Sequence, residues 1–468
     1  MTESWANSAD VGADLHVEPA PGRGLKAGLA EALREAVRGG RLAPGARLPS
    51  SRSLAADLGI ARNTVAEAYA ELVAEGWLTA RQGSGTRVAP RARPRKAAAA
   101  PAVRPPTRQG RAAYSLLPGS PDLGGFPRAA WLTAARRALT DAPNEAFGYG
   151  DPRGRVELRE ALAGYLARAR GVYADPERIV LCAGFVQGLM LMARVLRRRR
   201  VREVAVESYS LDVHRDLLTA EGLRTRPLLL DAAGARTPDL SGLAAGAVLL
   251  TPAHQFPTGV ALTPERRAAA VDWARASGGV ILEDDYDGEF RYDRQPVGAL
   301  QSLDPDRVVY LGTASKSLAP GLRLGWMVVP PGLLDEVLAA RGRVDWTSSA
   351  LEQLTLAQFI TSGAYDRHVR GMRLRYRRRR DQLVAAVGGR VAVSGIAAGL
   401  HAVLDLPAGT ERAVLQAAAW HSLALDGLSG FRHPDAVMPA RDALVVGYGT
   451  PPDSAWTPTL AALSSTLP

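Results

Sequence analysis

Cysteine is almost absent from this sequence, since Cys182 is the single cysteine among 468 residues. A framework of disulfides is thereby excluded, and a reducing cytoplasm is the expected compartment. Because Cys182 directly follows three apolar residues, we expect it to be a small buried thiol.

Long apolar runs are missing as well. Residues 1–14 are acidic and lack the apolar core of a signal peptide, and no run elsewhere is long enough to span a bilayer. We therefore expect a soluble protein that is not exported. Its length exceeds what one hydrophobic core supports, so two or three domains are expected.

The excess of basic over acidic residues lies in the N-terminal quarter of the chain. Residues 23–88 hold ten Lys or Arg against six acids, residues 89–113 hold seven against none, and the rest of the chain balances to zero. The formal net charge of +11 therefore arises in these two segments. A basic segment on an otherwise neutral body indicates a partner with a phosphate backbone.

The first basic segment has the pattern of three helices followed by a hairpin. Apolar spacing predicts a helix over 25–38, Ser50 is placed to cap a second one, and a third begins at Arg62. Two helices joined by a short turn at Gly59 predict a helix-turn-helix, whose second helix presents its N-terminal side chains to the major groove. Residues 77–88 read as two short strands around a glycine-containing tip. The alternative is a helical protein-interaction module.

Three motifs in this order resemble a GntR-type DNA-binding domain: LPSSR at 48–52, RNTV at 62–65 and GSGT at 83–86. The resemblance implies contacts with double-stranded operator DNA by Ser51, Arg52, Arg62, Asn63, Thr64, Arg81, Gly83 and Gly85. In it, the two arginines of the LPSSR and RNTV motifs contact bases, and Asn63, Thr64 and the wing contact the backbone or minor groove. Ala61 stands where the family usually has a capping serine, a loss of about 1 kcal/mol of helix stability.

Four segments are expected along the chain. They are an N-terminal tail (1–22), a winged helix (23–89), a linker (90–113) and a larger body (114–468), which divides into a large part at about 145–335 and a small part at about 336–468. The linker alternates Pro, Arg and Ala and should be an extended tether. Its cations either add affinity for DNA without sequence information or belong to a plain solvated spacer.

The body alternates apolar strands with helical stretches. Strands are predicted at 179–182, 204–206, 247–250, 279–282, 307–311 and 324–329. This alternation predicts an α/β fold with a mostly parallel sheet wrapped by helices. Ligands of such sheets lie beyond the carboxyl ends of the strands.

Lys316 lies just beyond one of these predicted strands. Thr313 and Ser315 precede it, Arg323 follows seven residues later, and Pro320 forces a turn between the two cations. This set suits an aldehyde cofactor that carries a phosphate, with the amine forming a Schiff base and the hydroxyls and arginine holding the phosphate. The alternative is a surface lysine in a basic loop.

Two further stretches fit the same cofactor. The strand at 279–282 leads to Asp284 and Tyr286, and pyridoxal phosphate needs a carboxylate at its ring nitrogen and a donor at its ring hydroxyl. Residues 183–188 join a strand to a helix, so that the backbone N–H groups of Gly184, Phe185 and Val186 predict an anion site for the phosphate.

These stretches resemble the fold-type I aminotransferases, as does the segment GYGDPRG at 148–154. Together with the N-terminal motifs, they are similar to the MocR branch of the GntR regulators, in which a winged helix is fused to an aminotransferase-like domain. The resemblance covers the chain from about residue 25 onward. It implies pyridoxal 5′-phosphate bound at Lys316, a smaller C-terminal α+β subdomain, and a homodimer that places two winged helices on two half-sites.

The sequence also departs from the family pattern. Phe256 stands where aminotransferases place an asparagine toward the ring hydroxyl, and neighbouring His254 is either a cofactor contact or a structural residue. The segment 207–211 reads ESYSL where the family often has E-x-P-G-Y with the aromatic stacked on the cofactor, so the side chain that stacks on the ring is unassigned. Val445 replaces the arginine that grips a substrate carboxylate, unless Arg432 or Arg441 substitutes for it.

The resemblance therefore implies a transcription regulator that responds to pyridoxal phosphate without physiological turnover, like the vitamin B6 regulators of the family. One alternative is a regulator that senses an amino acid joined to the cofactor, as GABA-responsive members do. Another is a working aminotransferase with an appended DNA-binding domain. The basic stretch 367–380 is expected to be a solvated helix face or a second DNA-touching surface.

Overall fold

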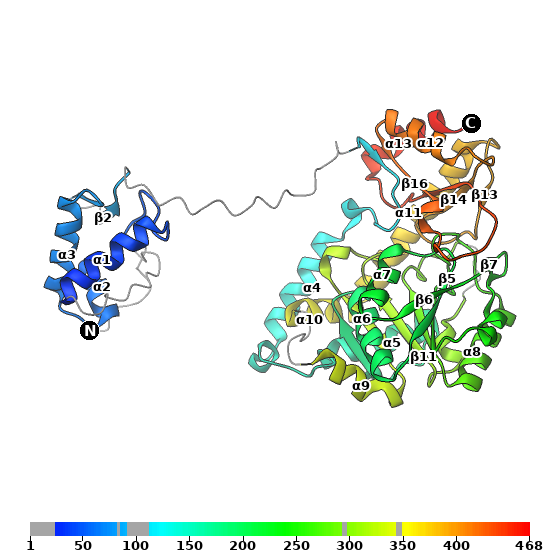
Figure 1. Ribbon diagram of the computed structural model, residues 1–468, viewed down its shortest axis with the longest axis horizontal. Helices are drawn as coiled ribbons and strands as arrows, with labels where there is room; N and C mark the ends of the chain where they lie inside the picture. The colour runs from blue at the N-terminus through cyan, green and yellow to red at the C-terminus, as the bar shows by residue number, and fades with distance from the viewer. Residues whose placement is uncertain (1–23, 82–84, 91–111, 293–296, 343–348) are drawn as a thin grey trace. The chain divides into compact units, whose positions relative to one another are not determined.

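The computed structural model describes residues 24–81, 85–90, 112–292, 297–342 and 349–468. The chain divides into two compact units, residues 1–109 and 110–468, each with its own core (Figure 1). Across the described ranges, no helix combines the length and the apolar character needed to cross a membrane.

The first unit is a three-helix domain with a β-hairpin. Its elements are α1 (Leu25–Arg38), α2 (Ser51–Leu58), α3 (Arg62–Ala74), β1 (Leu78–Arg81) and β2 (Gly85–Val88). The Ser50 hydroxyl caps α2 by accepting from the backbone N–H of Ser53 at 3.1 Å, and Gly59 ends that helix in the left-handed conformation. The strands pair antiparallel, so the predicted helices and hairpin strands are confirmed. The predicted contact Gly83 lies outside the described residues.

The second unit is built on a seven-stranded sheet in the order β4-β12-β11-β10-β9-β5-β6. The strands are β4 (Ile179–Cys182), β5 (Glu203–Glu207), β6 (Arg224–Leu228), β9 (Ala247–Leu250), β10 (Val280–Asp285), β11 (Val308–Thr313) and β12 (Gly325–Val328). Five neighbouring strands run parallel, whereas β12 pairs antiparallel with both β11 and β4. The predicted α/β class with a mostly parallel sheet is confirmed.

Helices cover both faces of this sheet, because alternate residues of the buried strands point to opposite sides. On one face, Val180 and Met327 pack against α6 (Phe185–Arg198) and α9 (Pro331–Arg341). On the other, Ile179 and Tyr310 pack against α5 (Val156–Arg170) and α10 (Ala350–Thr361), and Ile281 packs against α8 (Pro264–Ser277). The remaining elements of this part are α4 (Arg128–Asp141), α7 (Asp212–Ala220), β7 (Leu230–Asp231) and β8 (Gly234–Ala235).

The small part has a four-stranded antiparallel sheet in the order β13-β14-β17-β16. Its elements are α11 (Ala364–Val387), β13 (Val393–Ser394), β14 (Ala402–Asp405), α12 (Glu411–Trp420), β15 (Leu423–Ala424), β16 (Asp426–Gly427), β17 (Ala443–Val446) and α13 (Asp453–Thr466). Strand β3 (Tyr114–Ser115), far away in the sequence, pairs parallel with β15. Residues 114–115 therefore belong with the small part.

Helix α11 carries the basic stretch, which is only partly a solvated face. Arg379 is buried and donates to Asp453 at 2.6 Å and to Asp122 at 3.2 Å. Arg373 donates to the backbone carbonyl of Glu289. These arginines hold the helix against neighbouring segments of the same unit.

Candidate functional site

A cavity of about 300 Å³ lies beyond the carboxyl ends of β9, β10 and β11. The parallel register sets Asp284 of β10 opposite Leu311 of β11, which brings the ends of both strands to one place. The lining includes eight of the ten residues predicted for the cofactor: Phe185, Val186, Asp284, Tyr286, Thr313, Ser315, Lys316 and Arg323. The other two predicted residues contact the lining. Gly184 packs against the Arg323 guanidinium, and the carbonyl of His254 accepts from the Tyr286 hydroxyl.

Lys316 follows β11 by three residues and reaches into the cavity, where its amine donates to the backbone carbonyl of Gly119. Burial lowers the pKa of this amine, and the charges of Asp284 and Asp287 oppose that shift. A lowered pKa increases the fraction of neutral, nucleophilic amine. The side chain is thus able to attack an aldehyde.

Asp284 lies inside β10, not after its end, and its carboxylate faces the same cavity. Burial raises the pKa of this carboxyl well above its usual range, and the charge of Lys316 opposes the rise. Its buried Oδ1 has no hydrogen-bond partner within the described part of the chain. A buried oxygen without a partner is costly, and the protonated nitrogen of a pyridine ring is the donor that fits it.

Tyr286 is held in place by hydrogen bonding to the buried pair His254 and Asp287. Its hydroxyl donates to the His254 carbonyl at 3.0 Å, and His254 Nδ1 lies 2.9 Å from Asp287 Oδ2. His254 and Asp287 are both buried. His254 is therefore placed to position the phenol.

Groups that can bind an anion lie together where the cavity meets the N-terminus of α6. Gly184 precedes α6 with φ 84°, and a Cβ there would lie 3.2 Å from the Arg323 guanidinium. The hydroxyls of Thr313 and Ser315 lie 2.8 Å apart, and Arg323 donates to the carbonyl of Ala183. A helix N-terminus, two hydroxyls and a guanidinium together suit a phosphate.

Residues of the small part close the cavity, and the sequence patterns did not identify them. They are Leu400, His401, Asp426 and Phe431, and we call them the small-part wall. Glu207, Ser210, His214 and the segment 118–119 also line the cavity. No motif spacing connects positions so far apart in the sequence, so only the folded chain brings them together.

Leu211 stands where the family pattern has an aromatic, and it lines the cavity. His214, three residues further on, also lines it, and its ring centroid lies 4.7 Å from that of Phe185. Burial lowers the pKa of His214 to about 4, and the charges of Lys316 and Arg215 add to this effect. A neutral imidazole is thus available at this wall.

Neither proposed substitute for the missing arginine reaches the cavity. Arg432 donates to the carbonyls of Ala436 and Met438, each at 2.8 Å. Arg441 donates to Asp405 at 2.6 Å. Val445 itself is fully buried and packs in a cluster with Phe256 and Phe431, both of which line the cavity. Over the described ranges, Arg323 is the only arginine in the lining.

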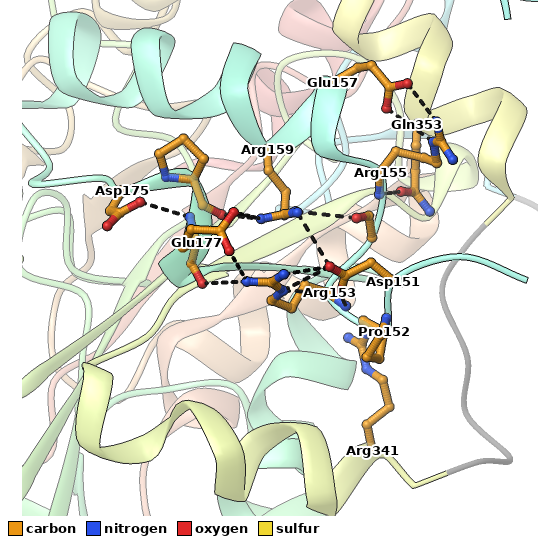
Figure 2. A network of polar contacts seen from close by, with 12 residues as sticks. Asp151, Pro152, Arg153, Arg155, Glu157, Arg159, Asp175, Glu177, Arg341 and Gln353 are labelled. Carbon is orange, nitrogen blue, oxygen red and sulfur yellow. Dashed lines mark hydrogen bonds and ion pairs between the residues drawn. The ribbon is translucent and has the colours of Figure 1, made fainter. Parts of the chain in front are cut away.

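A polar network surrounds residues 151–153 of the predicted family segment 148–154 (Figure 2). Arg153 pairs with Asp151 at 2.6 Å, and Arg159 pairs with Glu177 at 3.0 Å. Arg341 donates to the carbonyls of Pro152 and Leu181, each at 2.5 Å, and Leu181 lies at the end of β4. The network therefore ties this segment to the strand that leads into the anion-binding turn.

The predicted DNA contacts gather at the start of two helices and on the hairpin. Ser51 and Arg52 begin α2, whereas Arg62, Asn63 and Thr64 begin α3. Both arginines of this group are exposed, as is Asn63. The two remaining described positions, Arg81 and Gly85, are exposed at the facing ends of β1 and β2.

Comparisons with known proteins match both units. A family model for bacterial regulatory proteins of the gntR family matches residues 25–88, and one for aminotransferase class I and II matches residues 120–424. The HTH-type transcriptional regulator YhdI of Bacillus subtilis is 35% identical over 84% of this chain and 85% of its own length.

Two further relatives and two solved structures each match three quarters or more of this chain. The pyridoxine biosynthesis transcriptional regulator PdxR of Corynebacterium glutamicum is 32% identical over 94% of this chain and 95% of its own. The probable rhizopine catabolism regulatory protein MocR of Rhizobium meliloti is 34% identical over 76% of each chain. Kynurenine aminotransferase of Pyrococcus horikoshii gives a TM-score of 0.67 at 24% identity over 75% of this chain and 90% of its own. The aminotransferase LysN of Thermus thermophilus gives a TM-score of 0.66 at 22% identity, over 75% of this chain and 91% of its own. At these identities the two structures show the fold alone.

Proposed function

This chain belongs to the MocR branch of the GntR transcription regulators, and we propose that it couples operator binding to pyridoxal 5′-phosphate. Its winged helix binds double-stranded DNA, and its aminotransferase-like unit binds the cofactor as an effector. The protein acts in the cytoplasm and controls genes for vitamin B6 synthesis. The similarity to PdxR over nearly the whole chain supports this choice of target genes.

The observation that carries the proposal is the set of complementary groups in one cavity. Lys316 supplies an amine, the Oδ1 of Asp284 lacks a donor, and Arg323 lies with two hydroxyls at the N-terminus of α6. Pyridoxal phosphate supplies an aldehyde, a protonated ring nitrogen and a phosphate, each of which matches one of these groups. Tyr286, positioned by His254, would supply the group that faces the ring hydroxyl.

Turnover of an amino acid is not part of the proposed function. An amino acid brings a carboxylate, and Val445 with its aromatic neighbours offers this group no cation. Burying an unpaired carboxylate is costly, so the cofactor itself is the effector. It acts by linkage: its binding favours one arrangement of the dimer, and that arrangement changes the affinity for the operator.

A homodimer is the proposed assembly. Apolar side chains on α4 and in the segment after it are exposed, among them Leu132, Leu139 and Phe147 at 61%, 56% and 52%. Exposed apolar groups of this kind mark interaction surfaces. A second copy would cover them and would present two winged helices to two operator half-sites.

The chain allows a direct test of cofactor attachment, because Lys26, Lys96 and Lys316 are its only lysines. Borohydride reduction of cofactor-saturated protein, followed by peptide mass spectrometry, is expected to find the added mass on Lys316 alone. Lys316→Ala should abolish the visible absorbance band of the bound cofactor, whereas Lys26→Ala should keep it. Label on the other lysines with Lys316 unlabelled would refute the proposal, and rapid turnover of a keto acid would favour an aminotransferase.

A further inference from the structure

The small-part wall places a carboxylate beside the position of the missing arginine. Asp426 of β16 stands directly opposite Val445 of β17 in an antiparallel pair. Residues that oppose each other in such a pair have side chains on the same face of the sheet. Asp426 lines the cavity, and Val445 packs behind Phe256 and Phe431 of the same lining. The charge at this corner of the cavity is therefore opposite to that of an arginine.

The Asp426 carboxylate is not engaged by the protein. Within the described part of the chain, it makes no hydrogen bond through its side chain and no ion pair. Burial raises the pKa of this carboxyl, and the negative charge of Asp212 adds to the rise. A half-buried carboxylate next to another acid lacks the cation that would compensate it. A ligand that brings a positive charge is the natural complement.

The cavity offers little to a second anion. Lys316 and Arg323 are the only Lys or Arg residues of the lining in the described ranges, and both are assigned to the cofactor. Burial lowers the pKa of His214 to about 4, and it lowers the pKa of His401 well below its usual range. Both imidazoles are consequently neutral near pH 7. Arg215 does not line the cavity. Its guanidinium donates to the backbone carbonyls of Ser210 at 2.8 Å and Phe431 at 3.4 Å.

We propose that the cavity of the cofactor-loaded protein binds a cationic amine without a carboxylate, whose ammonium group pairs with Asp426. The inference rests on the proposed function to the extent that the cofactor occupies Lys316 and Arg323. It adds a ligand class to that function, because an amine would then modulate the response to the cofactor. An amino acid of the same length is rejected, since its carboxylate meets Asp426.

Three probes of matched length separate the charges: putrescine, butylamine and γ-aminobutyrate. Calorimetric titration of cofactor-loaded, full-length protein should show putrescine binding at least about ten-fold more tightly than γ-aminobutyrate, or about 1.4 kcal/mol. Butylamine carries the one ammonium group that the proposal requires and no carboxylate, so it should also bind more tightly than γ-aminobutyrate. Asp426→Asn should remove the preference for putrescine, and Asp426→Lys should reverse it in favour of γ-aminobutyrate.

Asp435→Asn is the matched control, because Asp435 is an exposed aspartate of the same small part and does not line the cavity. It should bind putrescine as the wild type does. The inference is overturned if no probe binds, if γ-aminobutyrate binds as tightly as putrescine, or if Asp426→Asn leaves the preference intact. In these cases an intact Lys316 absorbance band leaves the proposed function standing. A wild-type protein without that band overturns the proposed function and this inference with it.

Discussion

Three buried glutamates, Glu207, Glu283 and Glu289, lie in or shortly after strands β5 and β10, and burial raises the pKa of each to about 7. Glu207 lines the cavity and accepts from the Thr251 hydroxyl at 2.5 Å and from the Gln255 amide at 3.2 Å. These bonds favour the charged form, but burial outweighs them. The unit therefore carries carboxyl groups that are held protonated at pH values where exposed ones are ionised.

Glu207→Gln should flatten the dependence of stability on pH. Because the folded-state pKa is raised, the folded protein holds the proton more tightly, and this stabilisation is complete below about pH 4.5 and lost as the pH rises through about 7. Glutamine keeps an oxygen for all three donors that reach Oε2. Urea unfolding at pH 5 and at pH 7.5 measures how far the unfolding free energy falls between the two pH values. This fall should be smaller in Glu207→Gln than in the wild type, by on the order of 1–3 kcal/mol. An unchanged fall would show that Glu207 is not a titrating group in this range.

Two neighbouring acids in β10 show which site residues can be predicted from the sequence and which contacts cannot. Asp284 and Asp285 are adjacent, and alternation along the strand sends them to opposite faces. Asp284 faces the cavity, whereas Asp285 pairs with Arg170 at 2.7 Å and accepts from the Tyr310 hydroxyl at 2.7 Å. The sequence identified Asp284 as a carboxylate that follows an apolar run and precedes Tyr286 by two residues. The partners of Asp285 come from α5 and β11, and no local spacing indicates them.

Helix α3 begins without a side-chain cap, because Ala61 occupies the cap position and makes no capping bond. Its backbone is already extended there, with φ −65° and ψ 136°, which is the conformation a capping serine adopts. The free N–H groups at this end belong to the helix that carries Arg62 and Asn63. The start of the proposed recognition helix is thus less stable than it could be.

Ala61→Ser should stabilise the winged-helix unit by about 1 kcal/mol, since its hydroxyl can accept from an N–H of the first turn. Denaturant unfolding of the full chain, followed at the transition of this unit, measures the change. Ala61→Val provides no acceptor and should give no such gain. If serine and valine behave alike, the first turn of α3 does not limit the stability of this unit.

Strands with continuous apolar runs were predictable, and short or polar ones were not. The runs at β4, β9 and β11 are buried at every position of the strand. Edge strand β6 reads Arg-Thr-Arg-Pro-Leu and has exposed positions, so it lacks the hydrophobic signal. Strands β13 and β16 contain two residues each, too few for any periodicity. Consequently the small-part wall, which depends on β14 and β16, could not be derived from the sequence.

The two compact units divide the chemistry as well as the structure. Every residue that lines the cavity lies between positions 118 and 431, whereas all the predicted DNA contacts lie between 51 and 85. The winged-helix unit has its own buried core around Leu29, Val65 and Leu72. In the proposed function, a response of operator binding to the cofactor therefore has to be transmitted from one unit to the other.

Separating the units should consequently separate the two activities. Residues 110–468 alone should bind pyridoxal phosphate with the affinity of the full chain, because the whole cavity lies within them. Residues 24–90 alone should bind the operator without any response to the cofactor. Their affinity should fall by about 10²–10⁴-fold, since two winged helices joined in a dimer bind two half-sites at a high effective concentration.

Absorbance titration of the large fragment and operator gel shifts of the small one, each against the full chain, measure both effects. A large fragment that loses cofactor affinity would show that the winged helix contributes to the effector site. A small fragment that binds the operator as tightly as the full chain would show that dimerisation adds nothing to recognition. In the proposed dimer, cofactor occupancy should change operator affinity by no more than this gain from pairing two half-sites.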